Sequence, residues 1–257
     1  MRAIWTGSIG FGLVNIPVKL YSASESSSLD LHMLNKKDLS PIKYQRIDEE
    51  TGKEVAWEDI VKGYEVDGEF IILEDKDFER ANAKKSKIIE IDNFVPENEI
   101  PTTYYEKPYY LEPGKDAAHA YGLLLEALQK SKKVGIASFV MRNRESLALL
   151  KPLDNVIILN QIRFPEEIRT TRGLVLPDKK DFSKKELDLA LNLIDQYSTK
   201  LDLTVYKDTY TEELMKLIRM KAKGKMPETP KLKVVPTKTT DLMKQLQASL
   251  EKKKKAA

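Results

Sequence analysis

The stretch Met1–Ser22, MRAIWTGSIGFGLVNIPVKLYS, decides the fold. In its first half the apolar residues have odd numbers: Trp5, Ile9, Phe11 and Leu13. In its second half they have even numbers: Val14, Ile16, Val18 and Leu20. Each half has the alternation of a strand with one buried face. A one-residue slip moves every side chain to the opposite face, so an irregularity must lie between Gly10 and Pro17.

Two interpretations of this irregularity fit the pattern. Gly10 and Gly12 permit a bulge or a sharp bend, and Pro17 is confined to an edge, a strand start or a bulge. These residues predict two strand segments joined by a kink, as at a barrel corner. An ordinary N-terminal hairpin of a β domain fits the periodicity equally well.

The composition is typical of a soluble globular protein. The 257 residues suit one large or two modest domains, and they are 41% hydrophobic and 32% charged. No apolar run approaches the roughly 18–20 residues of a membrane helix, and Met1–Ser22 lacks the uninterrupted apolar core of a signal peptide. We therefore expect a cytoplasmic protein.

Several kinds of catalytic site are excluded. The chain has no cysteine and only two histidines, His32 and His119, which excludes disulfides, thiolate catalysis and zinc sites built on cysteine or on several histidines. It has no Walker-type phosphate loop, nucleophile elbow or G-x-G-x-x-G pattern. Acid clusters such as Asp48–Glu50 offer Mg²⁺ ligands and hence a metal-nuclease alternative, but such clusters are usually solvated faces. We predict a protein that is not an enzyme and binds neither metal nor cofactor.

The net charge of +3 is unevenly distributed. Residues 219–257 carry 12 basic residues and three acids, which leaves a net charge of −6 on the rest of the chain. Nucleic-acid affinity in the body must therefore come from local patches, whereas the tail is basic throughout. Three segments of the body are candidates: Lys36, Lys37, Lys43 and Arg46; Lys130, Lys132, Lys133, Arg142, Arg144 and Lys151; and Arg163, Arg169, Arg172, Lys179 and Lys180. From the residues alone, each patch is more easily explained as solvated surface.

Short alternating segments with turns between them extend to about residue 161. Strands are expected at 29–33, 42–47, 55–60, 70–73, 86–95, 103–111, 134–140, 146–150 and 156–161, which favours a sandwich or a barrel. A helix is expected at 74–85. Another follows Asp116 as its N-cap, with Tyr121, Leu124, Leu125 and Leu128 on its apolar face.

The remaining chain is predicted to be helical and then extended. Capping-box patterns at Ser183–Glu186 and Thr209–Glu212 precede two amphipathic helices, expected at 184–198 and 211–220. Residues 224–239 are rich in proline and lysine and suit a linker. A last helix and a lysine run follow, with the apolar stripe Leu242, Met243, Leu246 and Leu250, and then Lys252, Lys253, Lys254 and Lys255.

Several blocks of the chain resemble bacterial Ku, the DNA-end-binding protein of non-homologous end joining. They cover nearly the whole chain in family order: Arg2–Tyr21, Ile60–Glu65, Pro101–Leu111, Gly135–Leu150 and Asp241–Leu250. One departure is that Arg46–Val55 lacks the cysteines that some relatives carry there. The resemblance implies an α+β, mainly β fold: an antiparallel β-barrel, a bridge that completes a ring around DNA in the homodimer, and C-terminal helices.

With this resemblance, we expect the chain to consist of three parts. Residues 1–182 are expected to form the barrel core, including a bridge at about 32–62, which we call the bridge segment. Residues 183–223 are expected to form a helical arm for dimerisation, although packing against its own barrel is an equal alternative. Residues 224–257 are expected to hold the linker, a helix that docks on the ATP-dependent DNA ligase of end joining, and a basic tail.

The implied site residues follow from these parts. The expected DNA contacts of the bridge segment are Lys36, Lys37, Lys43, Arg46, Lys53 and Lys62. Arg142 and Arg144 are weaker candidates, because strand alternation allows both to lie on one sheet face outside the ring. The expected ligase contacts are Leu242, Met243, Leu246 and Leu250, and Lys252–Lys255 would add nonspecific DNA affinity.

The expected function is sequence-independent binding of double-stranded DNA ends by a homodimeric ring, cytoplasmic and associated with the nucleoid, that recruits and stimulates the ligase. The alternative is a barrel protein that binds single-stranded DNA or RNA without sequence preference. Such a protein stacks bases on exposed aromatic rings, and the only dense cluster is Tyr104, Tyr105, Tyr109 and Tyr110.

Overall fold

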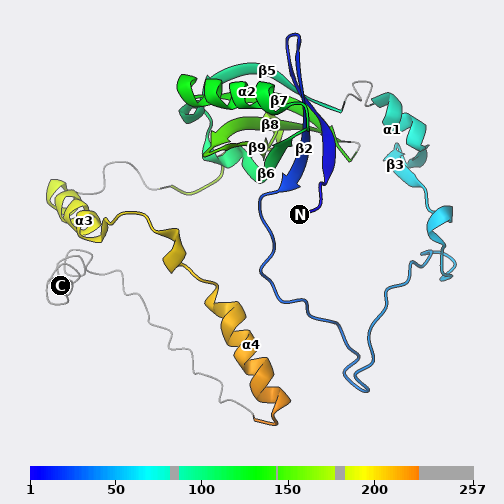
Figure 1. The fold of residues 1–257 in the computed structure, drawn as a ribbon. Coiled ribbons are helices and arrows are strands. Elements are labelled where there is room, and N and C mark those ends of the chain that lie inside the picture. Colours follow the sequence, from blue (N-terminus) through cyan, green and yellow to red (C-terminus); the bar gives the residue numbers. More distant parts are fainter. Residues whose placement is uncertain (82–86, 143, 177–182, 226–257) are drawn as a thin grey trace. The chain divides into compact units, whose positions relative to one another are not determined.

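A computed structural model describes residues 1–81, 87–142, 144–176 and 183–225 (Figure 1). The chain divides into two compact units. One contains residues 1–26 and 30–170, and the other contains residues 27–29 and the chain from 171 onward. The domain boundary expected at 182 falls in 177–182, outside the described residues.

Within the described residues, seven strands form a closed barrel in the order β1-β2-β6-β9-β8-β7-β5. Neighbouring strands are antiparallel except β1 and β5, whose parallel pairing closes the barrel. The strands are β1 Trp5–Phe11, β2 Val14–Ser22, β5 Ile88–Pro96, β6 Tyr105–Pro113, β7 Lys133–Met141, β8 Arg144–Leu153 and β9 Val156–Ile162. Three 3₁₀ turns lie between or after them: η2 Glu97–Glu99, η3 Thr102–Tyr104 and η4 Pro165–Glu167. The expected α+β fold with a β-barrel is confirmed.

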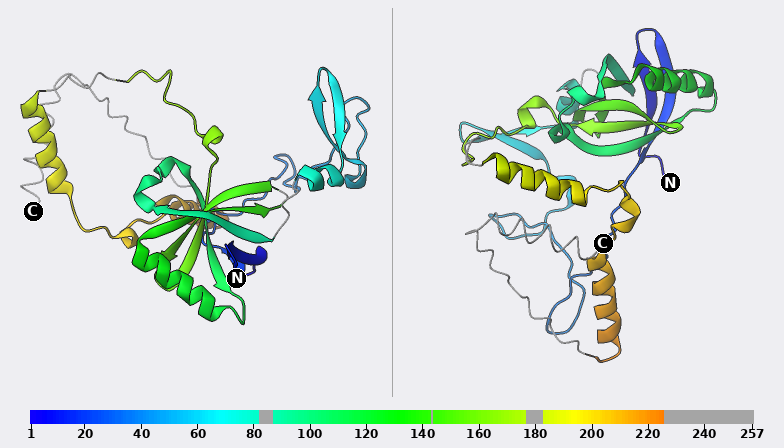
Figure 2. Two further views of the ribbon diagram at one scale, coloured as in Figure 1. Left: turned by 90° about the horizontal axis from the view of Figure 1, so that it is seen from above. Right: turned by 90° about the vertical axis from the view of Figure 1, so that its left-hand side faces the viewer.

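The opening stretch forms an antiparallel hairpin whose turn projects beyond the neighbouring strands (Figures 1 and 2). Phe11 pairs with Val14 across a turn in which Gly12 has a φ of +56°. Cross-strand partners share a face, so the apolar parity changes because the chain reverses direction. The kink interpretation was wrong, and the hairpin interpretation is confirmed. Leu13, expected on the buried parity, is fully exposed at the turn.

The barrel interior holds the main core, with fully buried residues from every strand. The largest are Phe139, Ile9, Ile16, Leu20, Ile89, Leu111, Leu150, Ile157 and Leu159. Helix α2 (Ala118–Ser131) packs its Tyr121, Leu124 and Leu128 into the same core, so its predicted apolar face is confirmed. The predicted N-cap was wrong by one residue, because the helix is capped at Ala117 without a side-chain hydrogen bond.

Hydrogen bonds of two side chains, Tyr121 and Trp5, tie the elements of the barrel together. The Tyr121 hydroxyl donates to the Leu111 carbonyl at 2.6 Å and accepts the Ile157 N–H at 2.7 Å, which joins α2 to β6 and β9. Burial raises the pKa of Tyr121, so the hydroxyl keeps its proton. The Trp5 Nε1–H donates to the Val140 carbonyl at 3.0 Å, which joins β1 to β7.

Between β2 and β5 the chain leaves the barrel. It forms two single backbone pairs, Leu34 with Pro41 and Ile47 with Glu54, then η1 Trp57–Asp59, the hairpin β3 Lys62–Val66 and β4 Glu69–Leu73, and α1 Asp75–Ala81. Longer strands were expected at 29–33, 42–47 and 55–60, and this was wrong. None of residues 30–73 is fully buried, and strands without a packed face are not stable.

The second unit contains α3 Lys184–Tyr197, η5 Leu203–Val205 and α4 Thr209–Ala222. The capping box before α3 is confirmed: Ser183 Oγ accepts the Glu186 N–H at 3.3 Å, and the Ser183 N–H donates to Glu186 Oε2 at 2.6 Å. The cap of α4 is Asp208 instead of Thr209. In the described part of the chain, no helix has the length and apolar character needed to cross a membrane.

Candidate nucleic-acid interface

Lys36 and Lys37 lie in a loop, residues 34–41, that holds its only acid away from them. Asp38 Oδ1 accepts the Ser40 N–H at 3.1 Å and the Ser40 hydroxyl at 2.8 Å. These hydrogen bonds lower the pKa of Asp38 and fix its carboxylate on the loop backbone. The two ammonium groups are exposed, and no ion pair of the described residues joins Asp38 to either of them.

Arg46 and Lys53 flank a tight turn at residues 48–52. Asp48 Oδ1 accepts the N–H and the hydroxyl of Thr51, both at 2.7 Å, and these bonds lower the pKa of Asp48. The Asp48 N–H donates to the Lys53 carbonyl at 2.9 Å. The turn therefore sets the positions of the two backbone segments that carry Arg46 and Lys53.

Two cations of this region lie over aromatic rings. The Arg46 guanidinium carbon is 4.4 Å from the centre of the Trp57 ring, and Lys62 Nζ is 4.9 Å from the centre of the Phe78 ring. Neither aromatic residue was among the predicted site residues. The rings are 11 and 16 residues from their cations, so no helix or strand periodicity connects the partners.

The predicted bridge contacts share two properties. They are all exposed, and no ion pair of the described residues involves any of them: Lys36, Lys37, Lys43, Arg46, Lys53 and Lys62. The charge is nevertheless uneven, because residues 32–47 hold four cations and one acid, whereas residues 48–62 hold two cations and six acids. The first half of the bridge segment therefore has the stronger attraction for phosphate.

Arg142 and Arg144 do not share a strand. Met141 pairs with Arg144 across β7 and β8, so the chain reverses between the two arginines, and Arg142 has a φ of +53°. The expected alternation along one strand was wrong. Arg144 Nη2 lies 3.0 Å from Glu167 Oε1, whereas Arg142 is exposed. Their contact with DNA stays a prediction, and the neutralised Arg144 is the weaker of the two.

Other cations of the second and third basic segments are also engaged. Lys130 pairs with Glu126 at 2.8 Å, and Lys151 pairs with Glu97. Arg163 Nη1 donates to the Tyr105 carbonyl at 2.8 Å. These contacts leave the bridge segment with the largest set of cations that form no ion pair among the described residues.

The tyrosine cluster of the single-strand alternative is not an exposed platform. Tyr109 is buried in β6, and Tyr104, Tyr105 and Tyr110 are half-buried. Bases stack on open ring faces, and each of these rings is at least partly covered by the protein.

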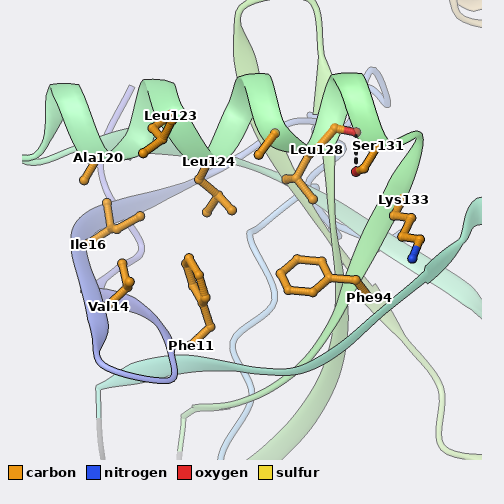
Figure 3. A pocket seen from close by; sticks show the side chains of 11 residues that line it. Phe11, Val14, Ile16, Phe94, Ala120, Leu123, Leu124, Leu128, Ser131 and Lys133 are labelled. Atoms are coloured by element: carbon orange, nitrogen blue, oxygen red, sulfur yellow. Dashed lines mark hydrogen bonds between the residues drawn. The ribbon is translucent and has the colours of Figure 1, made fainter.

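A groove of about 560 Å³ lies between the β1–β2 hairpin, β5 and α2 (Figure 3). Its lining is mostly apolar: Phe11, Val14, Ile16, Phe94, Ala120, Leu123, Leu124, Ala127, Leu128, Ser131 and Lys133. A groove with this lining does not suit phosphate, so we do not count it in the nucleic-acid interface.

Some predicted residues lie outside the described part of the chain. They are the ligase contacts Leu242, Met243, Leu246 and Leu250, the tail Lys252–Lys255, and Lys179 and Lys180. Within residues 1–81, 87–142, 144–176 and 183–225, no group of three His, Asp or Glu side chains is arranged to hold a metal ion.

Comparison with known proteins gives one consistent result. A family model named Ku and described as "Ku70/Ku80 beta-barrel domain" matches residues 10–189. Three similar proteins carry the name "Non-homologous end joining protein Ku". The protein from Coxiella burnetii is 37% identical over 99% of this chain and 96% of its own length. Those from Opitutus terrae and Bacillus subtilis are 42% and 37% identical, over 86% and 98% of this chain and 80% and 82% of their own lengths.

Proposed function

The chain belongs to the Ku family of non-homologous end joining proteins, and from this premise we propose that it binds double-stranded DNA ends as a homodimeric ring and recruits an ATP-dependent DNA ligase. Ku proteins are not catalysts, which confirms the expectation that the chain is not an enzyme.

The observation that carries the proposal is the set of exposed cations on the bridge segment, none of which forms an ion pair with a carboxylate among the described residues. Lysine and arginine contacts to phosphates supply affinity without sequence information. A protein that must act at any break needs this kind of contact. We assign the contacts to Lys36, Lys37, Lys43 and Arg46 first, and to Lys53, Lys62 and Arg142 after them.

Specificity for ends follows from closure of the ring. A closed ring lined by cations binds any duplex, but a duplex enters it only where the strand pair terminates. Recognition of ends is then topological and needs no contact with base edges. Closure requires a stable interface between the two copies, because an opened ring accepts a continuous duplex.

The second unit supports such an interface. Helix α3 exposes Leu187, Leu191, Ile194 and Tyr197, and the chain after it exposes Leu201, Leu203, Val205, Tyr206 and Tyr210. Contiguous apolar patches mark interaction sites, and Leu187, Leu191 and Ile194 follow one another at helical spacing along α3. An apolar face of this kind needs a partner surface, and we assign that surface to a second copy of the arm, residues 183–223.

Recruitment of the ligase is assigned to the end of the chain. The stripe of Leu242, Met243, Leu246 and Leu250 has the spacing of a narrow apolar helix face, which suits docking into a groove on a partner. The family resemblance of this block supports a ligase as the partner. Lys252–Lys255 would add phosphate contacts of their own.

The single-strand alternative has weaker support. Its stacking residues are buried or half-buried in the described structure, whereas the bridge cations are exposed. We therefore favour binding of duplex ends.

One competition experiment tests the function. Linear duplex and covalently closed circular duplex of equal sequence compete for the protein at several salt concentrations. We expect strong preference for the linear form and an affinity that falls steeply with salt. Equal binding to both forms would disprove the end-binding ring, and a preference for single strands would support the alternative.

A further inference from the structure

We propose that Trp57 is a positioning residue, which holds the guanidinium of Arg46 ready for a DNA phosphate without neutralising its charge. The inference rests on the proposed function and deepens it, because it names a residue that acts through a phosphate contact. Four observations support it: the position of the cation over the ring, the hydrogen-bonded backbone, the exposure of the indole, and the absence of a competing carboxylate among the described residues.

The contact with Trp57 leaves the hydrogen-bonding groups of Arg46 available. Its guanidinium carbon lies 4.4 Å from the centre of the Trp57 ring. A cation–π contact uses none of the five N–H donors of the guanidinium for an anion, and no hydrogen bond or ion pair of the described residues engages the Arg46 side chain. These donors match the oxygens of a phosphate, which arginine binds with two parallel hydrogen bonds.

The backbone fixes the two side chains relative to each other. The Arg46 carbonyl accepts the Val55 N–H at 2.8 Å, and Ile47 pairs with Glu54 in the next step. Trp57 then opens the short helix η1, where its carbonyl accepts the Ile60 N–H at 3.3 Å. The contact between ring and cation is therefore set by a folded turn.

The indole is placed where a ligand can reach it. The Trp57 side chain is 72% exposed, which is unusual for the largest apolar side chain. A duplex that contacts Arg46 would also cover part of the ring.

A carboxylate would hold Arg46 equally well but would compete with phosphate. Glu54, Glu58 and Asp59 are close in sequence, yet none forms an ion pair with Arg46 in the described structure. Glu54 Oε2 instead accepts a hydrogen bond from Gln45 Nε2 at 3.2 Å. An aromatic ring restricts the motion of the cation and leaves its full charge for DNA.

A double-mutant cycle on the full-length protein tests the proposal with a short linear duplex. Trp57→Ala is expected to weaken binding about two- to fivefold per copy, the factor that an exposed cation–π contact supplies. Arg46→Ala is expected to weaken binding further and to lower the salt slope by about 0.9 for each phosphate that is no longer neutralised. Trp57→Ala removes no charge, so its salt slope should equal that of the unmodified protein.

The double variant, Arg46→Ala with Trp57→Ala, distinguishes a positioning role of Trp57 from an independent contact of Trp57 with DNA. If Trp57 acts through Arg46, the double variant binds as Arg46→Ala does. If the double variant is weaker by the full Trp57→Ala factor, or if Trp57→Ala binds normally, the proposal is wrong. Trp57→Phe should restore most of the affinity, because it keeps an aromatic face. Tyr64→Ala removes another exposed ring, one that lies under no cation of the described residues, and should leave affinity unchanged.

Tryptophan fluorescence gives a second, direct measurement. The chain has two tryptophans, and Trp5 is half-buried in the barrel with its Nε1–H bonded to Val140. Linear duplex should protect the Trp5→Phe variant from quenching by acrylamide, because Trp57 is then its only tryptophan. If Trp5→Phe unfolds, disappearance of the DNA-dependent protection in Trp57→Phe gives the same answer. Quenching that DNA does not change would contradict the proposal.

Failure of this inference is distinct from failure of the proposed function. The cycle requires only that the protein binds duplex, whether or not it prefers ends. A chain that binds linear and circular duplex equally would lose the ring but could still show coupling between Trp57 and Arg46. A chain that prefers ends but shows no coupling would keep the ring and lose the positioning role.

Discussion

The cations of the bridge segment differ in how they are held, and this difference predicts what each substitution changes. Lys36 and Lys37 are exposed in a loop whose one acid is bonded to Ser40. Replacing both lysines by glutamine should lower the magnitude of the salt slope by about 0.9 for each phosphate that they neutralise. The slope is measured from duplex affinity between low and moderate salt.

Lys151→Gln is the matched control for this pair of lysines. Lys151 is already paired with Glu97, so its replacement should leave the salt slope almost unchanged. A slope that responds to Lys151→Gln but not to the two loop lysines would move the DNA contact away from the bridge segment.

Gly7 lies where the barrel closes, and a side chain there would prevent closure. A Cβ atom on Gly7 would be 2.1 Å from the Lys87 carbonyl oxygen and 2.2 Å from the Trp5 ring. The same carbonyl accepts the Ser8 N–H at 2.9 Å, so it cannot move without separating β1 from β5. Gly7→Ala should lower the free energy of unfolding by about 1–3 kcal/mol or more, measured by denaturant titration.

Gly122 provides the control for the glycine at the closure. It lies in α2 with no atom within 4 Å of its added Cβ. Gly122→Ala should therefore stabilise the protein by about 0.5–1 kcal/mol, through helix propensity. Equal effects of the two substitutions would contradict the close approach at Gly7.

For individual residues, the sequence showed where basic side chains cluster but not which side chains contact each other in the fold. Lys36, Lys37 and Arg46 could be selected because basic residues cluster along the chain. Trp57 could not be selected, because its contact depends on a turn closed by Asp48 and Thr51. The pair of Arg144 with Glu167 was hidden for the same reason, since the partners are 23 residues apart.

Among the elements, helix α3 offers the clearest test of the dimer. Leu191 is exposed on its apolar face, and Leu191→Asp should shift the protein from dimer to monomer by placing a charge in the interface. Analytical ultracentrifugation over a range of concentrations measures the shift. The variant should also lose its preference for linear over circular duplex, because the ring no longer closes.

Asn192→Asp adds the same charge at the neighbouring exposed position of α3 and should leave the dimer intact. If Leu191→Asp stays dimeric, the arm packs elsewhere and the interface must be sought on another surface.

Alternation of apolar residues predicted the buried face of the barrel strands but failed in the bridge segment. It identified Ile16, Val18 and Leu20 as buried, because alternation reports which face is covered. It could not decide between a kink and a reversal at Gly12, because both change the parity. In the bridge segment it predicted strands that do not form, because alternation there has no core to pack against.

At the scale of the whole molecule, the end of the chain should be separable from DNA binding. Truncation after Lys225 removes the apolar stripe and the lysine run but none of the bridge segment. We expect the truncated protein to bind linear duplex detectably and to lose its stimulation of the ligase in an end-joining assay. Replacing only Lys252–Lys255 with glutamine should keep the stimulation. Unchanged ligation by the truncated protein would disprove the docking helix.

The fold class could be predicted from the sequence, but the pairing of β1 with β5 that closes the barrel could not. Short strands separated by turns indicated a sandwich or a barrel, and the resemblance of the blocks to a known family indicated the barrel. The pairing of Ser8 with Ile88 in β1 and β5 joins residues 80 positions apart, and no local signal encodes such a contact. Because the pair is parallel, no hairpin turn marks it either.

This closure has a consequence for how the proposed ring can change in size. The chain between Ser22 and Ile88 begins and ends on strands that both pair with β1, so the barrel holds its two ends in place. Lengthening a loop held in this way is inexpensive, since doubling it adds only about 0.6 kcal/mol of closure entropy. In the proposed ring, the bore would therefore be set by an insertion that can grow or shrink while the strands of the barrel keep their register. The diameter of the encircled object would then be adjustable separately from the barrel.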